Sequence, residues 1–281
     1  MSTLVPPLYV GLVDDASVLP PSVTSVTDAL TTVREHRQAW YADLLGSLLV
    51  PASLVGFDRS WPALPIGLIN DAALATLPAS LAKLRAAGAA VRQIEAAVAR
   101  RGEDPQPGLG ELRRFAGEVA GLPVYAEIPL SWGLLAALDT VAEVRAGGLP
   151  FAPKFRVGGL AAELFPTPVE LAAVICACRD RELPFRLAAG LRHAIRHTDP
   201  ETGFTHHGFL NVLAAALVAA GGGEVAEVAE VLAATHPVPL VESVRSRRGD
   251  QRPLFIGFGA ANVVEPLTEL VRLGLINGGY E

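Results

Sequence analysis

The sequence predicts a (β/α)8 barrel of the TIM type, and three observations lead to this prediction. Eight short strand-like runs can be marked along the 281 residues, and most are separated by stretches with helical spacing. The length is close to that typical of such a barrel. An open doubly wound sheet is the alternative, but no glycine-rich phosphate-binding motif follows the first run, where residues 12–16 read Leu-Val-Asp-Asp-Ala. We expect residues 1–281 to form a single barrel domain.

The predicted strands are short apolar runs bounded by turn residues. In order, they cover residues 8–13, 48–52, 64–69, 90–95, 122–128, 151–157, 184–188 and 253–258. The fourth run has the least regular pattern. A tandem-repeat solenoid is not indicated, because the sequence has no fixed period.

The predicted helices lie between these strands. They cover residues 26–45, 77–87, 108–120, 131–145, 167–181, 208–220, 224–234 and 263–273. The fifth has the clearest start, with Thr167 at the cap, Pro168 at the first helical position and Glu170 placed for a capping box. Residues 189–207 are expected to form a long polar loop.

Composition limits the possible partners. The hydrophobic share is 51%, much of it alanine, but charged or polar residues interrupt every long apolar run, so we expect no membrane span. A net charge of −6 argues against a nucleic-acid surface. The first residues contain no Lys or Arg and lead into a strand-like run, which predicts a cytoplasmic protein. Cys176 and Cys178 are expected to be packed thiols. A monomer and a homo-oligomer are both compatible with the sequence.

Three consecutive predicted strands place charged residues on one face. Side chains alternate across a strand, so the apolar residues of each run should face the outer helices and the others the barrel interior. The interior set would then contain Tyr125 and Glu127, followed by Lys154 and Arg156, and then Arg186. Lysine occurs only twice in the chain, which makes a lysine in a buried strand unusual.

These interior charges must be compensated, because burying an unpaired charge is costly. Glu127 faces three cations in this set, which predicts a positive centre that a small anionic metabolite would complete. The alternative is a salt-bridge network without chemistry, in which acidic residues near other strand ends neutralise the cations. The candidates for that role are Asp14, Asp58, Asp71 and Glu95.

Lys154 falls on the sixth predicted strand, and this placement is similar to class I aldolases, whose barrels carry a Schiff-base lysine on strand six. The resemblance implies a lyase in which Lys154 forms an imine with a carbonyl substrate. Such chemistry needs a neutral amine, and Arg156 together with burial is expected to lower the lysine pKa. Glu127 is the candidate proton shuttle and Tyr125 its substitute. Arg156 and Arg186 are the candidate anion clamps.

A second resemblance covers about 60 residues. Lys154-x-Arg156-x-Gly158-Gly159, Phe165-Pro-x-Pro168, Ala189-Gly-Leu-x-His193 and His207-Gly-Phe-Leu-Asn211 together resemble a family of uncharacterised bacterial proteins. These motifs support the location of the site. They imply no reaction.

The segment after the seventh predicted strand is rich in histidine. It contains His193, His197, His206 and His207, which a barrel would place at the active-site rim. His193 and His207 are candidate substrate-binding residues. A metal-assisted hydrolase that uses this loop is an alternative function, although no carboxylate ligand is fixed by the sequence and we assign neither a metal nor a cofactor.

Glycines mark a possible anion site. Gly158 and Gly159 after the sixth strand, and Gly257 and Gly259 after the eighth, could present backbone N–H groups to a phosphate. Tight turning is an equally good reason for glycine at these positions. The sequence therefore predicts an enzyme that acts on a small anionic carbonyl or phosphorylated metabolite, or else a catalytically silent barrel that binds one.

Overall fold

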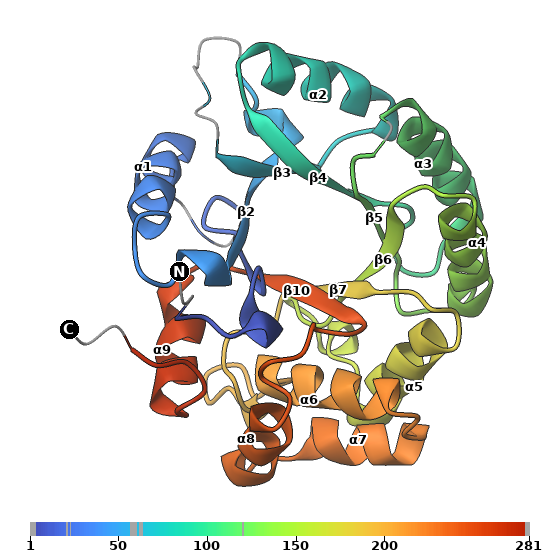
Figure 1. Ribbon diagram of the computed structural model, residues 1–281. Coiled ribbons are helices and arrows are strands. Elements are labelled where there is room, and N and C mark those ends of the chain that lie inside the picture. Colours follow the sequence, from blue (N-terminus) through green and yellow to red (C-terminus); the bar gives the residue numbers. More distant parts are fainter. Residues whose placement is uncertain are drawn as a thin grey trace.

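Eight parallel strands close into a barrel, as predicted. The computed structural model describes residues 4–20, 22, 24–56, 61, 64–119 and 121–278. The strands follow one another around the barrel in the order β1-β10-β7-β6-β5-β4-β3-β2 (Figure 1). Their bounds are β1 (Val13–Asp15), β2 (Leu45–Pro51), β3 (Pro65–Asn70), β4 (Ala90–Ala97), β5 (Val124–Glu127), β6 (Phe151–Arg156), β7 (Phe185–Ala188) and β10 (Phe255–Ala260).

Helices surround the strands (Figure 1). Their bounds are α1 (Val26–His36), α2 (Leu77–Ala86), α3 (Gln106–Glu118), α4 (Leu134–Ala146), α5 (Pro168–Arg179), α6 (Phe209–Ala220), α7 (Val225–Ala233), α8 (Pro237–Arg245) and α9 (Val264–Arg272). Short 3-10 turns lie at η1 (Pro7–Tyr9), η2 (Ala42–Leu44), η3 (Ala52–Leu54), η4 (Leu74–Thr76) and η5 (Ala162–Leu164). Three of the helices, α6 to α8, lie between β7 and β10 in the chain.

Four elements differ from the prediction. The first strand begins at Val13, because the apolar run before it forms η1. The helix predicted over 26–45 ends at His36. No helix was predicted over α8, which begins at Pro237, at the first helical position, where a missing N–H costs nothing. The polar loop contains the two-stranded hairpin of β8 (His197–Thr198) and β9 (Thr205–His206).

The strands pack their outer faces on the helices. Phe151, Phe155 and Phe185 are fully buried, and Phe185 stacks on Phe255 with ring centroids 5.6 Å apart. The alternation expected for β5 to β7 is therefore correct on its apolar side. Cys176 and Cys178 are buried free thiols in α5, as expected. No helix among the described residues is both long and apolar enough to cross a membrane.

Glycines keep part of the barrel interior open. A Cβ at Gly46 of β2 would overlap Asp14 Oδ1, and a Cβ at Gly67 of β3 would lie 2.6 Å from Leu49 Cδ2 and 3.0 Å from Gln93 Cγ. Both positions therefore exclude any larger residue without a shift of their neighbours. The space is occupied by Asp14 at Gly46, and by Leu49 and Gln93 at Gly67.

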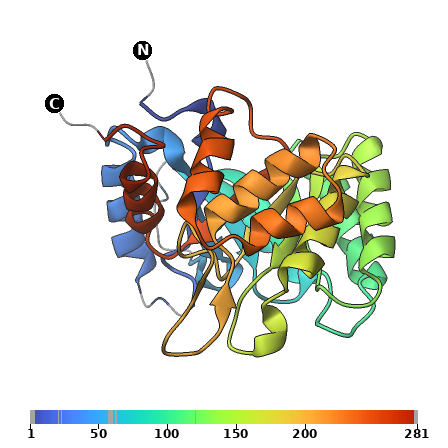
Figure 2. The ribbon, with the colours of Figure 1, turned by 90° about the horizontal axis from the view of Figure 1, so that it is seen from below.

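The hairpin and the segment after β6 project from the same end of the barrel (Figure 2). This is the end at which the parallel strands finish, since both segments directly follow a strand. In barrels of this kind the loops at this end carry the active site. The candidate site is therefore sought there.

Candidate active site

Strand register brings three of the predicted site residues together. Glu127 of β5 is paired with Lys154 of β6, and Lys154 is paired in turn with Arg186 of β7. Residues at equal height on neighbouring strands of a barrel point to the same side. Their contacts with one another and with Glu95 and Asp14 confirm that all three point into the barrel.

Six charged residues form one continuous series of ion pairs, which we call the interior ion chain. Arg186 Nη2 binds Asp14 Oδ2, and Arg186 Nε lies 3.5 Å from Glu95 Oε1. Lys154 Nζ lies 2.7 Å from Glu95 Oε2 and 2.8 Å from Glu127 Oε2. Arg156 Nη2 completes the series at 3.2 Å from Glu127 Oε1. The signs alternate from Asp14 to Arg156.

Exposure along the ion chain rises toward the mouth of the barrel. The side chains of Asp14, Arg186 and Glu95 are 1%, 4% and 1% exposed. Lys154 follows at 8%, Glu127 at 18% and Arg156 at 48%. Only the last two members are open enough to meet a ligand directly.

The predicted positive centre is wrong. Asp14 and Glu95 enter the network from β1 and β4, so three carboxylates balance three cations. Gln93 Nε2 and the Ser47 backbone N–H also donate to Asp14, at 2.8 and 2.7 Å. Of the other acids considered, Asp71 contacts Ser53 outside the barrel interior, and Asp58 lies outside the described residues. The formal charges of these six side chains thus sum to zero, and burial outweighs Arg186 to hold the pKa of Asp14 above its ordinary value.

The expected fall in the lysine pKa is also wrong. Burial lowers the pKa of Lys154, but the neighbouring Glu95 and Glu127 carboxylates outweigh it and hold that pKa above the ordinary lysine value. Arg156, which was expected to repel the ammonium, instead binds the far oxygen of Glu127. Lys154 is therefore an ammonium at neutral pH, and an amine nucleophile would first have to lose a well-held proton.

Arg186 and Tyr125 lie in the depth of the barrel. The Arg186 guanidinium carbon is 5.0 Å from the centroid of the Tyr125 ring. Burial lowers the pKa of Arg186, but Asp14 and Glu95 outweigh it and raise that pKa above the ordinary arginine range. Burial raises the pKa of Tyr125. This arrangement occupies Arg186 within the protein, so it does not support the expected role of Arg186 as an anion clamp or of Tyr125 as a proton shuttle.

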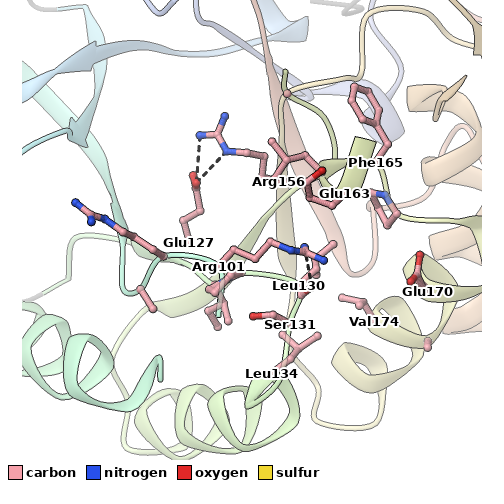
Figure 3. A pocket seen from close by; sticks show the side chains of 18 of the residues that line it. Arg101, Glu127, Leu130, Ser131, Leu134, Arg156, Glu163, Phe165, Glu170 and Val174 are labelled. Atoms are coloured by element: carbon pink, nitrogen blue, oxygen red, sulfur yellow. Dashed lines mark hydrogen bonds and ion pairs between the residues drawn. The ribbon is translucent and has the colours of Figure 1, made fainter. Parts of the chain in front are cut away.

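A groove of about 1030 Å³ opens beside the mouth of the barrel (Figure 3). The segments that follow β4, β5 and β6 form its sides, together with the first turns of α4 and α5. Large aliphatic side chains form much of the lining: Ile128, Leu130, Leu134, Leu135, Leu160, Leu164 and Val174. Glu127 and Arg156 also line it. The groove therefore meets the interior ion chain at its exposed end.

The glycines have packing roles. A Cβ at Gly158 would lie 2.8 Å from Gly190 Cα, so the segments after β6 and β7 could not approach as they do. A Cβ at Gly159 would overlap Leu164, and one at Gly257 would lie 2.5 Å from the Leu12 carbonyl oxygen. Gly257 and Gly259 lie within β10 and not after it. The geometry favours close packing over anion binding at these positions.

The histidines lie beside the groove in two groups. His197 stacks on His206 with ring centroids 5.2 Å apart and meets the edge of His193 at 4.4 Å, and His193 Nδ1 lies 2.7 Å from Glu269 Oε1. His207 is buried, with Nε2 donating to the Pro166 carbonyl oxygen at 2.8 Å. Within the described ranges, no group of three or more His, Cys, Asp or Glu side chains converges as metal ligands would. The described residues therefore lend no ligand cluster to the hydrolase alternative.

No protein-family model matches this sequence, and no curated protein matches it. The two resemblances noted from the motifs stay predictions.

The sequence predicted the interior side chains of β5 to β7 but not the groove. Asp14 and Glu95 were considered only as acids able to neutralise the cations. Gln93 and Glu95 are two residues apart on β4 and so share one face of the strand, as Tyr125 and Glu127 do on β5. The groove residues come from three connecting segments, and their convergence follows from the barrel and not from any spacing in the sequence.

Proposed function

We propose that this protein is an enzyme that acts on a small anionic carbonyl compound in the groove at the barrel mouth. The observation that carries the proposal is the position of Glu127, which belongs both to the interior ion chain and to the groove lining. A carboxylate at the edge of a ligand-sized groove meets the geometric requirement for an acid–base residue.

Arg156 is the proposed anchor for the anionic group of the substrate. Its side chain is the most exposed cation of the ion chain, and its guanidinium can form two parallel hydrogen bonds to a carboxylate or phosphate. Lys154 is the proposed electrostatic partner of Glu127. A lysine ammonium that stays protonated stabilises negative charge as it develops, without forming a covalent intermediate.

Substrate binding and proton abstraction are coupled in this scheme. Burial raises the pKa of Glu127, but Lys154 and then Arg156 outweigh it and hold that pKa below its ordinary value. An anion that engages Arg156 withdraws one of these two cations, so the pKa of Glu127 rises. Glu127 becomes a stronger base when substrate is present. The carbon–hydrogen bond beside the carbonyl breaks, the proton moves to Glu127 Oε1, and the electron pair moves to the carbonyl oxygen as an enolate.

Hydrogen–deuterium exchange tests this function without knowledge of the final product. We expect the protein in D2O to exchange protons beside the carbonyl of at least one member of a panel of 2-oxo acids, 3-oxo acids and phosphorylated ketones, measured by proton NMR. Glu127→Gln should lower the exchange rate by at least about 100-fold, since general-base catalysis contributes roughly that factor or more. Arg156→Met should mainly raise KM.

Borohydride added to the same mixtures separates this scheme from an imine lyase. We expect no reduced adduct on Lys154 in the peptide map. An adduct on Lys154 would overturn the proposed role of the ammonium. Saturable binding with no proton exchange across the panel would favour the second candidate, a barrel that binds an anionic metabolite without transforming it. The complete pairing of the charges in the ion chain supports this candidate.

A further inference from the structure

We infer that the groove binds an anion with an extended aliphatic chain, the head group at Arg156 and the chain along the α4–α5 side. This inference deepens the proposed function and rests on it for its catalytic meaning. It names the substrate class as an aliphatic carboxylic acid.

The size of the groove is the first observation. About 1030 Å³ is at the upper end of the range for ligand sites, far more than a small metabolite of a few carbon atoms fills. The ion chain touches only one part of this volume, at Glu127 and Arg156 (Figure 3). The rest is available to a part of the ligand that does not react.

The chemistry of the lining is the second observation. Leu130 from the segment after β5, Leu134 from α4 and Val174 from α5 point toward the groove (Figure 3). Leu164 from η5 also lines it. Phe165 is the one aromatic residue among its lining residues. A surface of this composition favours a saturated chain through the hydrophobic effect.

Exposed leucines on the rim are the third observation. Leu160 is 97% exposed and Leu135 is 59% exposed, and both line the groove. Large aliphatic side chains are rarely left this open beside a cavity that already exposes apolar surface, and contiguous apolar patches of this kind mark binding sites. A chain lying in the groove would cover both.

The charge expected of the ligand's head group follows from which charged lining residues already have hydrogen-bond or ion-pair partners. Glu127 is shared between Lys154 and Arg156, and Glu170 accepts from the backbone N–H and the hydroxyl of Thr167, at 2.7 and 2.8 Å. Arg101 donates from one nitrogen to the Leu130 carbonyl oxygen at 3.1 Å, which leaves further donors on its planar head. The remaining carboxylate of the lining, Glu163, is exposed on the rim. Two of the three lining carboxylates are therefore already engaged, while Arg101 and the remaining nitrogen of Arg156 can donate to an anion.

Saturated ligands of matched length test the inference by calorimetry on the full chain. We expect decanoate to bind and hexanoate to bind on the order of 100-fold more weakly, because each buried methylene tightens binding by up to about fourfold. Decanol should bind at least about tenfold more weakly than decanoate. Arg156→Met should remove this difference between acid and alcohol.

Two matched tryptophan substitutions locate the site. Ala173 is exposed on α5 and lines the groove, whereas Ala136 is exposed on α4 and is not among the lining residues. We expect Ala173→Trp to abolish decanoate binding and Ala136→Trp to leave it unchanged. Equal binding of decanoate and decanol, or unchanged binding to Ala173→Trp, would overturn the inference.

Glu127→Gln keeps this test separate from that of the enzymatic proposal. The variant should bind decanoate at least as tightly as the wild type, because a negative charge beside the head group is removed. Decanoate binding without proton exchange on any oxo acid would remove the enzymatic proposal and keep the ligand class. Proton exchange on short oxo acids, with no binding of decanoate, would do the reverse.

Discussion

Replacement of Arg186 by methionine is expected to destabilise the folded protein by about 3–5 kcal/mol, the range for removing one partner of a buried ion pair. Asp14 and Glu95 are each 1% exposed and would lose the cation that lies between them. Lys154 still compensates Glu95 from its other side, but Asp14 would keep only neutral donors from Gln93 and Ser47. Urea denaturation of both proteins measures the difference in the free energy of unfolding.

Arg247→Met is the matched control for this substitution. Arg247 Nε forms an ion pair with Asp250 in which both side chains are 51% exposed, so its loss should cost at most about 1 kcal/mol. Adding Asp14→Leu to Arg186→Met should recover part of the loss, since replacing both charges leaves less to compensate. A cost below about 1 kcal/mol for Arg186→Met alone would contradict the ion chain.

Gly46→Ala is expected to destabilise the protein by about 1–3 kcal/mol, as overpacking a filled interior does. The added methyl group would overlap Asp14 Oδ1, which accepts from the Ser47 backbone N–H at 2.7 Å. Asp14 would have to leave this position, and its pairing with Arg186 would weaken. Thermal and urea unfolding measure the change.

Gly110→Ala is the matched control for Gly46→Ala. Gly110 lies in α3, and a Cβ there would meet nothing within 4 Å among the described residues. The same substitution should stabilise this helix by up to about 1 kcal/mol, because alanine has the higher helix propensity. Equal effects at the two positions would contradict the close contact at Gly46.

The fold was predictable because the strand pattern, the helix pattern and the helix-capping residues all indicate the same architecture. Short apolar runs alternate with helical stretches, and Thr167 and Glu170 form the capping box that their spacing predicts. The errors occurred where local pattern does not decide the structure. Pro237 is compatible with a helix start as well as with a break, and Tyr9 belongs to an apolar run that is buried as a 3-10 turn and not as a strand.

The candidate site was predictable only in part. Strand alternation places Glu127, Lys154 and Arg186 in the interior, because neighbouring strands have a fixed register. The charge balance was not predictable in the same way, since Asp14 and Arg186 are 172 positions apart and meet only when the barrel closes. The sign of the lysine pKa shift was predicted wrongly, because Glu95 reaches Lys154 from β4, two strands away, and adds to the effect of Glu127.

The protonation state of Lys154 tests the central claim most directly. The chain contains two lysines, Lys83 and Lys154, so selective 13C labelling at lysine Cε gives two NMR signals, which Lys83→Arg assigns. We predict that the Lys154 signal keeps its ammonium shift throughout the pH range in which an ordinary lysine, with a pKa of about 10.4, begins to titrate. A midpoint near pH 7 to 8, as an imine-forming lysine requires, would contradict an ammonium held between Glu95 and Glu127.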